Sequence, residues 1–396
     1  MTEFANWSGG LRFTPADRVS PASEGELSEL LRQAAADGRT VRAVGSGHSS
    51  APLVRTDGLL VSLDHFDGLI SHDADARRAT LGSGTPIHRA GQELLKVGLA
   101  MENTGDIDRQ TLAGGFATGT HGTGRTLGNL STQLAGVRLV LASGEVLELG
   151  EDDGDLLRAA RVSLGALGIA TALTLRLVPA FRVHRSERCA PWREVRDRLD
   201  ELAAENRNFD FYWYPRKDEV KLRRINEITD DRPDHEVRRG SERDMVGWSA
   251  DVLPRVRELR FHEMEYALPA EAGPACFAEV RERVRARHLR HVAWRVLYRT
   301  IAADDAYFST AHGRDTVTIS LHQNQDLPYL DYFADLEPIF QAHGGRPHWA
   351  KLFTLKGEAL LSRYPMAGRW LAARRRLDPG GLFLTPYLRD LLGVAR

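Results

Sequence analysis

Hydrophobic and polar positions recur along the first half of the chain with two periods, one helical and one strand-like. Apolar residues spaced three and four positions apart predict helices over 25–36, 86–97 and 155–161. Short apolar runs predict strands over 40–44, 59–63, 79–81 and 169–178. Two alternating segments on either side of Ala142-Ser143-Gly144 predict a hairpin over 137–141 and 145–149. Helices and strands are therefore mixed in this part of the chain.

The pattern changes after Pro179, which places a domain boundary near residue 178. Further strands are expected over 209–214, 221–228, 294–298 and 316–322. Helical spacing returns over 192–205, 274–287 and 330–341. Residues 230–243 are highly charged and are expected to form an exposed loop.

Composition narrows the class of protein. The 396 residues are 42% hydrophobic and 27% charged with a net charge of −1, so no general attraction to nucleic acid or to a membrane surface is expected. Cys189 and Cys276 are too few for a disulfide framework and have no metal-ligand spacing. The chain contains no run of eighteen apolar residues and no leader-like N-terminus, so a soluble, cytoplasmic protein is expected.

Two glycine-rich stretches suggest a ligand. Residues 41–50 read VRAVGSGHSS, and residues 111–124 read TLAGGFATGTHGTG. Glycines allow positive φ and let backbone N–H groups approach a phosphate, and small residues contribute little to a packed core. Two such loops in one domain predict a bulky, phosphate-bearing cofactor.

Other site types do not match these loops. Neither has the Gly-Lys-Ser/Thr of a nucleotide P-loop, and Ser50 stands at the sixth position of a dinucleotide fingerprint. The chain has no G-x-S-x-G elbow, and its histidines lack metal-ligand spacing, so no metal is expected.

Four segments carry a resemblance to a known family. The VRAVGSGHS stretch resembles the first FAD-pyrophosphate loop of the vanillyl-alcohol-oxidase-type flavoproteins, and the ATGTHGTG stretch resembles the second flavin loop of their sugar and aldonolactone oxidase branch. Residues 346–351 (RPHWAK) resemble the H-W-G/A-K signature of that branch, and residues 378–383 (DPGGLF) resemble its closing segment. The branch includes alditol oxidases and gulono- and arabinono-lactone oxidases. The motifs occur in the expected order over nearly the whole chain.

The resemblance implies an α+β fold with two parts. A two-subdomain FAD-binding domain of the PCMH type would span residues 12–178. A substrate-binding cap domain with a mixed or antiparallel sheet would span 179–396, and its segment from about 345 would pack back on the flavin.

The resemblance also assigns the cofactor, FAD, which His48 would bind covalently through its imidazole. A hydrogen bond from His48 without a covalent link is the alternative. The other residues implied in FAD binding are Ala43, Val44, Gly45, Ser46, Gly47, Ser49, Thr111, Phe116, Gly119, Thr120, His121, Gly122, Thr123, Ile169 and His348.

On the substrate side, the resemblance gives catalytic roles to Arg299, His322 and Lys351, with His322 as the candidate general base. Thr111, Leu297 and Asn324 match substrate-binding positions. Leu297 stands where the family has a glutamate, and Asn324 where alditol oxidases have threonine. Loss of that carboxylate predicts a larger or less polar substrate than a small polyol.

The implied activity is transfer of a hydride from a CH–OH group of a sugar alcohol, sugar derivative or aldonolactone to flavin N5. Reoxidation by O2 would give H2O2. A dehydrogenase on the same fold, using another electron acceptor, is one alternative, and Gln110 beside Thr111 is bulky for an open oxygen path. A flavin-binding protein without turnover is the other. The expected partners are a small polyol, sugar or lactone and O2, with the chain acting as a monomer.

Overall fold

The first part of the chain builds a small parallel sheet with the order β3-β5-β4, in a computed structural model that describes residues 2–254 and 259–395. Its strands are β3 (Asp17–Val19), β5 (Leu59–Ser62) and β4 (Val41–Val44). Helix α1 (Glu24–Ala36) begins at Ser23, whose side chain accepts a hydrogen bond from the Glu26 backbone, and it buries Leu27 and Leu31 against this sheet. The preceding strands β1 (Phe4–Ala5) and β2 (Arg12–Phe13) pair with each other. The glycine-rich segment 45–49 directly follows β4.

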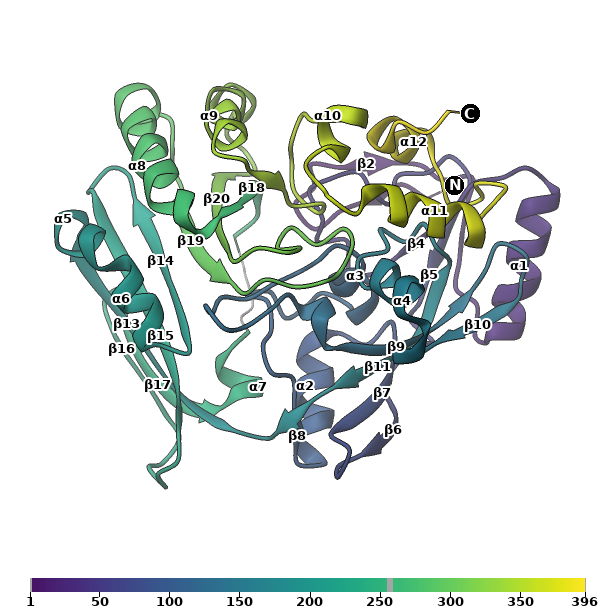
Figure 1. The fold of residues 1–396 in the computed structure, drawn as a ribbon, viewed down its shortest axis with the longest axis horizontal. Helices are drawn as coiled ribbons and strands as arrows, with labels where there is room; N and C mark the ends of the chain where they lie inside the picture. The colour runs from purple at the N-terminus through teal and green to yellow at the C-terminus, as the bar shows by residue number, and fades with distance from the viewer. Residues whose placement is uncertain (1, 255–258, 396) are drawn as a thin grey trace.

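A five-stranded antiparallel sheet lies beside the parallel one (Figure 1). Its strands in spatial order are β10 (Val146–Leu149), β9 (Leu134–Val140), β11 (Ile169–Arg176), β7 (Arg78–Gly82) and β6 (Leu69–Asp73). The helices of this region are α2 (Ile87–Lys96), α3 (Leu112–Ala117) and α4 (Gly154–Ala160), with single turns at Leu130–Gln133 and Glu151–Asp153. Strands β8 (Leu99–Ala100) and β12 (Val178–Pro179) form a short separate pair.

A nine-stranded antiparallel sheet forms the other side of the molecule. Its strands in spatial order are β16 (His235–Arg239), β17 (Glu242–Trp248), β13 (Arg182–Pro191), β15 (Glu219–Ile228), β14 (Asn208–Tyr214), β19 (Val296–Ile301), β20 (Thr316–Asn324), β18 (Phe261–Pro269) and β21 (Arg346–Pro347). The helical segments that accompany it are α5 (Trp192–Val195), Arg196–Arg198, α6 (Leu199–Glu205), α7 (Ser249–Val252), Ala270–Ala272, α8 (Gly273–Arg283), Val284–His288 and α9 (Leu330–Ala342).

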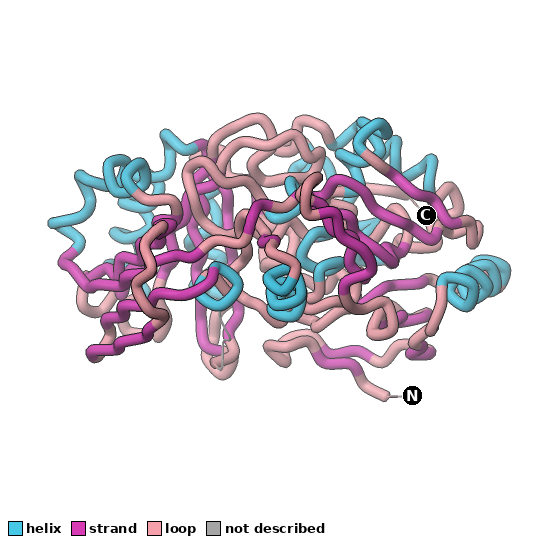
Figure 2. Tube along the Cα trace, turned by 90° about the horizontal axis from the view of Figure 1, so that it is seen from below, coloured by secondary structure: helices cyan, strands magenta, loops and turns pink. Residues whose placement is uncertain are grey.

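The two faces of this sheet have different surroundings. On β14, Phe209, Phe211 and Trp213 belong to the apolar core shared with α5, α6, α8 and α9, which cover the outer face in Figure 1. Asp210 and Tyr212 point to the opposite face, which is turned toward the middle of the molecule. In Figure 2 the loops gather in this middle region, between the sheets. The alternation therefore places polar side chains where the two halves meet.

The C-terminal segment returns to the first half of the chain. Helices α10 (Gly357–Leu361), α11 (Ala367–Leu377) and α12 (Pro386–Leu392) lie beside α4 and the parallel sheet, at the right of Figure 1. The indole N–H of Trp370 donates to the Val162 carbonyl at 2.9 Å, and the Val41 amide donates to the Leu382 carbonyl at 3.0 Å. The last residues of the chain thus complete the packing around β4.

Most expected elements are present, including the hairpin of β9 and β10. Residues 230–243 are exposed as expected, but they form β16 and the start of β17, an edge hairpin, and not a loop. Several elements were not expected, among them strands β6 and β13 and helices α11 and α12. Strand β18, between β20 and β21, was not expected either. Cys189 and Cys276 are both free. Within residues 2–254 and 259–395, no helix combines the length and the apolar character needed to cross a membrane.

Candidate functional site

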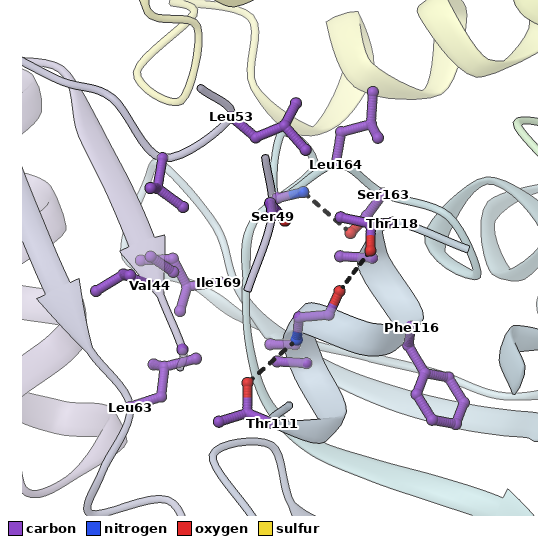
Figure 3. Close-up of a pocket in the computed structure, with 18 of the residues that line it drawn as sticks. Val44, Ser49, Leu53, Leu63, Thr111, Phe116, Thr118, Ser163, Leu164 and Ile169 are labelled. Carbon is purple, nitrogen blue, oxygen red and sulfur yellow. Dashed lines mark hydrogen bonds between the residues drawn. The ribbon is translucent and has the colours of Figure 1, made fainter. Parts of the chain in front are cut away.

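A deep cleft lies between the loop after β4 and helix α3 (Figure 3). It holds about 1080 Å³ of empty space and is lined mainly by residues within 42–49, 110–118 and 163–170, together with apolar side chains of β9. We call it the apolar cleft. Val44, Leu63 and Ile169 line one wall in Figure 3, and Phe116 lies across from them. A cleft with mainly apolar side chains and a backbone loop along one wall suits a large organic ligand.

The glycine-rich loop forms one wall of this cleft because its backbone approaches α3 closely. A Cβ on Gly45 would lie 2.1 Å from the Thr111 hydroxyl oxygen, so no other residue fits there without displacement. Gly47 adopts a φ of 66°, which favours glycine. Thr111 caps α3 by accepting a hydrogen bond from Gly114 N–H. Exposed backbone donors and absent side chains fit a phosphate-bearing group.

His48 lies where the cleft turns toward the nine-stranded sheet. Its ring packs at 5.2 Å from that of Trp7. Its Nδ1 is buried and has no hydrogen-bond partner among the described residues. Burial, followed by the charge of Lys351, lowers the pKa of His48 to about 4, so the ring is neutral at pH 7. His48 thus places a neutral imidazole in the lining of the cleft, with one ring nitrogen that no described group of the protein engages.

Arg42, which sequence reasoning did not single out, holds the walls of the apolar cleft together. Its guanidinium donates to the carbonyls of Leu164 at 2.6 Å, Gly165 at 2.7 Å and Phe383 at 3.0 Å. Burial lowers the pKa of Arg42 to about 10, against the opposing charge of Asp378, so the group remains charged at pH 7. One side chain thereby joins β4 to the loop before β11 and to the C-terminal segment.

The apolar cleft brings together most residues expected to bind the cofactor. These are Ala43, Val44, Gly45, Ser46, Gly47, His48, Ser49, Thr111, Phe116 and Ile169.

A second cleft adjoins the first, and His48 and Gln110 line both. It holds about 690 Å³ of empty space. Its walls are residues within 105–110 and the inward face of β14, β18, β19 and β20, together with His348, Ala350 and Lys351. We call it the charged cleft. Among the expected site residues, it gathers Thr120, His121, Leu297, Arg299, His322, His348 and Lys351.

Glu265 is the centre of one charge cluster in this cleft. Its Oε1 lies 2.8 Å from Nε2 of His121, and its Oε2 accepts hydrogen bonds from Arg299 and from the Ser320 hydroxyl. All four side chains are buried. Burial raises the pKa of Glu265, but Arg299 and His121 outweigh it and hold the pKa well below its usual range. The Arg299 guanidinium is therefore held in a fixed position beside the cleft.

Glu263, two residues earlier on β18, is the centre of a second cluster. Its Oε2 lies 2.5 Å from Nζ of Lys351, and its Oε1 lies 3.3 Å from Nε2 of His322. Nδ1 of His322 lies 3.1 Å from the Arg295 carbonyl oxygen, to which it donates. Burial raises the pKa of Glu263, but Lys351 and His322 outweigh it and hold the pKa below its usual range. One carboxylate thus positions two of the three expected catalytic groups.

Leu297 lines the charged cleft, as expected from its place on β19. The cleft also contains two carboxylates that sequence reasoning did not single out, because β18 supplies Glu263 and Glu265 from the other side of β20. Sequence reasoning missed both because it missed the strand. Its signal was the period-two run Met264, Tyr266 and Leu268, which faces the apolar core.

Four expected site residues do not line either cleft: Asn324, Gly119, Gly122 and Thr123. Phe261, the register partner of Asn324, lines the charged cleft at that end. The Thr123 hydroxyl donates to the Phe209 carbonyl at 2.5 Å, which ties the second glycine-rich loop to the nine-stranded sheet.

His121, Glu265 and His348 place their ligand atoms within 4.8 Å of one another, a spacing that could hold a metal ion. Their hydrogen bonds oppose this use. Arg299 occupies one oxygen of Glu265, and Nδ1 of His348 accepts from the Ala350 backbone N–H at 3.1 Å. Burial lowers the pKa of His348 to about 3, so its Nε2 carries the ring proton and faces the cleft as a donor.

Two family models match the chain. Residues 173–241 and 234–391 match the family described as D-arabinono-1,4-lactone oxidase. The chain belongs to that family. Residues 15–150 match the FAD binding domain family, which assigns the cofactor FAD to the first half of the chain.

Relatives of known activity cover the whole length of this lactone oxidase family member. It is 36% identical to an L-gulono-1,4-lactone dehydrogenase of Mycobacterium tuberculosis, over 98% of this chain and 99% of that protein. It is 29% identical to the L-gulonolactone oxidase of Mus musculus, over 98% of each chain. An alditol oxidase of Streptomyces sp. is 30% identical over 99% of each.

Among solved structures, cholesterol oxidase from B. sterolicum superposes with a TM-score of 0.88 at 17% identity, over 98% of this chain and 96% of that one. At this identity the likeness concerns the fold. These findings confirm the expected α+β fold class, the resemblance to the aldonolactone oxidase branch, and the expectation of an FAD-dependent oxidoreductase acting on CH–OH groups.

Proposed function

We propose that the protein oxidises a CH–OH group of an aldonolactone or a closely related sugar derivative, with FAD in the apolar cleft and the substrate in the charged cleft. The carrying observation is that the two clefts meet at His48 and Gln110, so a substrate in one reaches a cofactor in the other. Relatives named for gulonolactone, arabinonolactone and alditol substrates support this substrate class.

FAD supplies the acceptor for the hydride. The loop 43–49 and the N-terminal end of α3 hold it by backbone contacts, and Arg42 keeps the surrounding walls in place. His48 bonds it covalently through the free nitrogen of its neutral ring, as its buried, unpartnered Nδ1 supports. Val44 and Ile169 pack against it from one side of the cleft.

The charged cleft orients the substrate and handles the hydroxyl proton. Arg299 and Lys351 place two cations around the reacting hydroxyl, which stabilises the oxygen as its proton leaves. His322 takes up that proton at Nε2, because its Nδ1–H is committed to the Arg295 carbonyl. Glu263 orients His322 and Lys351. Thr111, which lines the apolar cleft next to Gln110, contacts the substrate from that side.

Anaerobic mixing of the purified holoenzyme with candidate aldonolactones and alditols tests this proposal. Loss of the oxidised flavin absorbance at 1:1 stoichiometry supports it. A flavin that no sugar derivative reduces, in a protein that retains FAD, contradicts it and favours a flavin-binding protein without turnover.

O2 is the proposed electron acceptor, with H2O2 as product, as in the relatives named oxidases. One observation favours a dehydrogenase instead: the Gln110 side chain lies at the junction of the clefts, where a small residue would leave a path for O2. The 36% identical relative is named a dehydrogenase. Stopped-flow reoxidation of the reduced holoenzyme by O2 distinguishes the two. Stoichiometric H2O2 supports an oxidase, and slow reoxidation that a dye accelerates supports a dehydrogenase.

We further propose that residues 12–178 form the FAD-binding unit and residues 179–396 the substrate-binding unit, with the segment from about 345 returning to the cofactor. The contacts of Arg42 with Phe383 and of β18 with β21 support this division. We propose as well that the chain acts as a monomer, which sedimentation equilibrium of the holoenzyme tests.

A further inference from the structure

Arg295 differs from the other cations that line the charged cleft. Arg299 pairs with Glu265, and Lys351 pairs with Glu263. The third acidic residue of the lining, Asp106, accepts hydrogen bonds from Arg223, which lies outside the lining, and from Tyr212. Within residues 2–254 and 259–395, Arg295 has no carboxylate partner. Among the described residues, Arg295 is therefore a cation of the cleft lining that no carboxylate pairs with.

The Arg295 guanidinium is nevertheless held in place. It stacks over the ring of Tyr212, with its central carbon 4.1 Å from the ring centroid, and lies 5.5 Å from the ring of Trp294. Burial raises the pKa of Tyr214, and the charge and hydrogen bonding of Arg295 oppose that rise, so Tyr214 is a further neighbour. Aromatic neighbours fix the guanidinium plane without consuming its charge. Its Nε is buried without a hydrogen-bond partner among the described residues, and the side chain lines the charged cleft.

Arg295 also has a defined place relative to the proposed reacting end. It directly precedes β19 and shares the inward face with Leu297 and Arg299 at period two. Four residues along a strand span about 13 Å, so the two arginines contact different parts of a bound molecule.

We propose that Arg295 binds a carboxylate of the substrate, so that the protein acts on a sugar acid in its open, anionic form in preference to a neutral polyol or lactone. This inference rests on the proposed function of the cleft. A substrate that fills the cleft removes water from Arg295, and a neutral substrate leaves that charge without compensation. A carboxylate compensates it through two parallel N–H···O hydrogen bonds.

The experiment compares three ligands with the same six-carbon skeleton: an aldonate, its 1,4-lactone and the corresponding alditol. Anaerobic flavin reduction gives the apparent Kd and the limiting rate for each, and calorimetry on the chemically reduced holoenzyme, which cannot accept a hydride, gives the Kd of the aldonate without turnover. The variants are Arg295→Gln, which removes the charge, and Arg295→Lys, which keeps it without the planar fork. Arg290→Gln, an exposed arginine outside both clefts, is the matched control for net charge.

We expect the unaltered protein to bind the aldonate at least tenfold more tightly than the alditol. Arg295→Gln should weaken aldonate binding by about 10- to 100-fold, which is the range for a lost charge-assisted hydrogen-bonded pair, while the alditol value changes by less than about threefold. The aldonate affinity of Arg295→Lys should lie between those of the unaltered protein and Arg295→Gln. Arg290→Gln should leave the preference for the aldonate over the alditol intact. Equal losses for all three ligands in Arg295→Gln would show a structural role and overturn the proposal.

Failure of this inference is distinguishable from failure of the proposed function. If the lactone or alditol reduces the flavin and the aldonate neither reduces it nor binds, the function stands and the carboxylate site is wrong. If no ligand reduces the flavin but the aldonate binds in an Arg295-dependent way, the carboxylate site stands and the oxidation is wrong.

Discussion

The carboxylate of Glu263 lies 2.5 Å from the Lys351 ammonium, although 88 residues separate them in the chain. The same carboxylate faces His322. Glu263 on β18 therefore links β18 to the neighbouring strand β20 and to the loop after β21, at the edge of the charged cleft. The relationship explains how Lys351 and His322 remain close together in a buried site.

Replacing Glu263 with Gln should therefore disrupt both partners. We expect the limiting rate of flavin reduction to fall by about 100-fold, because Lys351 and His322 lose the group that positions them. The free energy of unfolding should fall by about 3 kcal/mol, as for other buried pairs that lose one partner. Stopped-flow reduction and urea denaturation measure the two effects. Glu279→Gln, which breaks the surface pair with His343, is the control and should change neither by much.

His48 offers a direct test of the covalent link. After acid precipitation, the yellow colour of the unaltered protein should stay in the pellet, while that of His48→Ala should move to the supernatant. His48→Ala should still bind FAD, because the glycine-rich loop and Arg42 remain. His65→Ala, an exposed histidine, should behave like the unaltered protein. Free FAD released from the unaltered protein would contradict the link.

The buried ring of His348 predicts a pH dependence of stability. Burial lowers the pKa of His348 to about 3, whereas an unfolded histidine titrates near 6.5. Between about pH 4 and 6 the unfolded chain therefore holds a proton that the folded chain lacks, so stability falls as the pH falls. One such proton contributes about 1.4 kcal/mol per pH unit. In His348→Asn, whose side-chain oxygen can still accept from Ala350 N–H, the slope of unfolding free energy against pH should be smaller by this amount. An unchanged slope in urea titrations would show that His348 is not responsible.

Arg42→Met retains the aliphatic stem but removes three hydrogen bonds to buried carbonyls. We expect a loss of about 3 kcal/mol or more in the free energy of unfolding and a reduced FAD content after purification. The ratio of flavin to protein absorbance and urea denaturation measure these effects. Arg18→Met, an exposed arginine on β3 of the same sheet, should retain both stability and FAD. A fully loaded Arg42→Met protein would contradict the role given to Arg42.

The periodicity of hydrophobic positions and the turn-forming residues predict much of the fold, and two segments show where such prediction fails. On β18 the apolar face of Met264, Tyr266 and Leu268 alternates with glutamates that are also buried, so a pattern that equates charge with exposure misses the strand. For residues 235–239 the prediction fails for the opposite reason, because a strand is present without any buried face. Both faces of β16 are exposed and charged, and only its pairing with β17 makes it a strand.

Part of the candidate site can likewise be predicted from the sequence and part of it cannot. Residues 45–49 are contiguous in the sequence, and their composition by itself indicates a ligand loop. The pairing of Glu263 with Lys351, and of Glu265 with His121, depends on which strands are neighbours in the nine-stranded sheet. Sequence spacing carries no information on such contacts between distant segments.

The contact between Arg42 and the Phe383 carbonyl joins residues 341 positions apart. During translation, β4 and its glycine-rich loop emerge from the ribosome well before the residues that close the wall behind them. The nascent chain consequently cannot complete its cofactor site until residue 383 has been synthesised, so stable loading with FAD has to wait for that point. A protein shortened before residue 383 would possess both glycine-rich loops and still fail to retain the flavin.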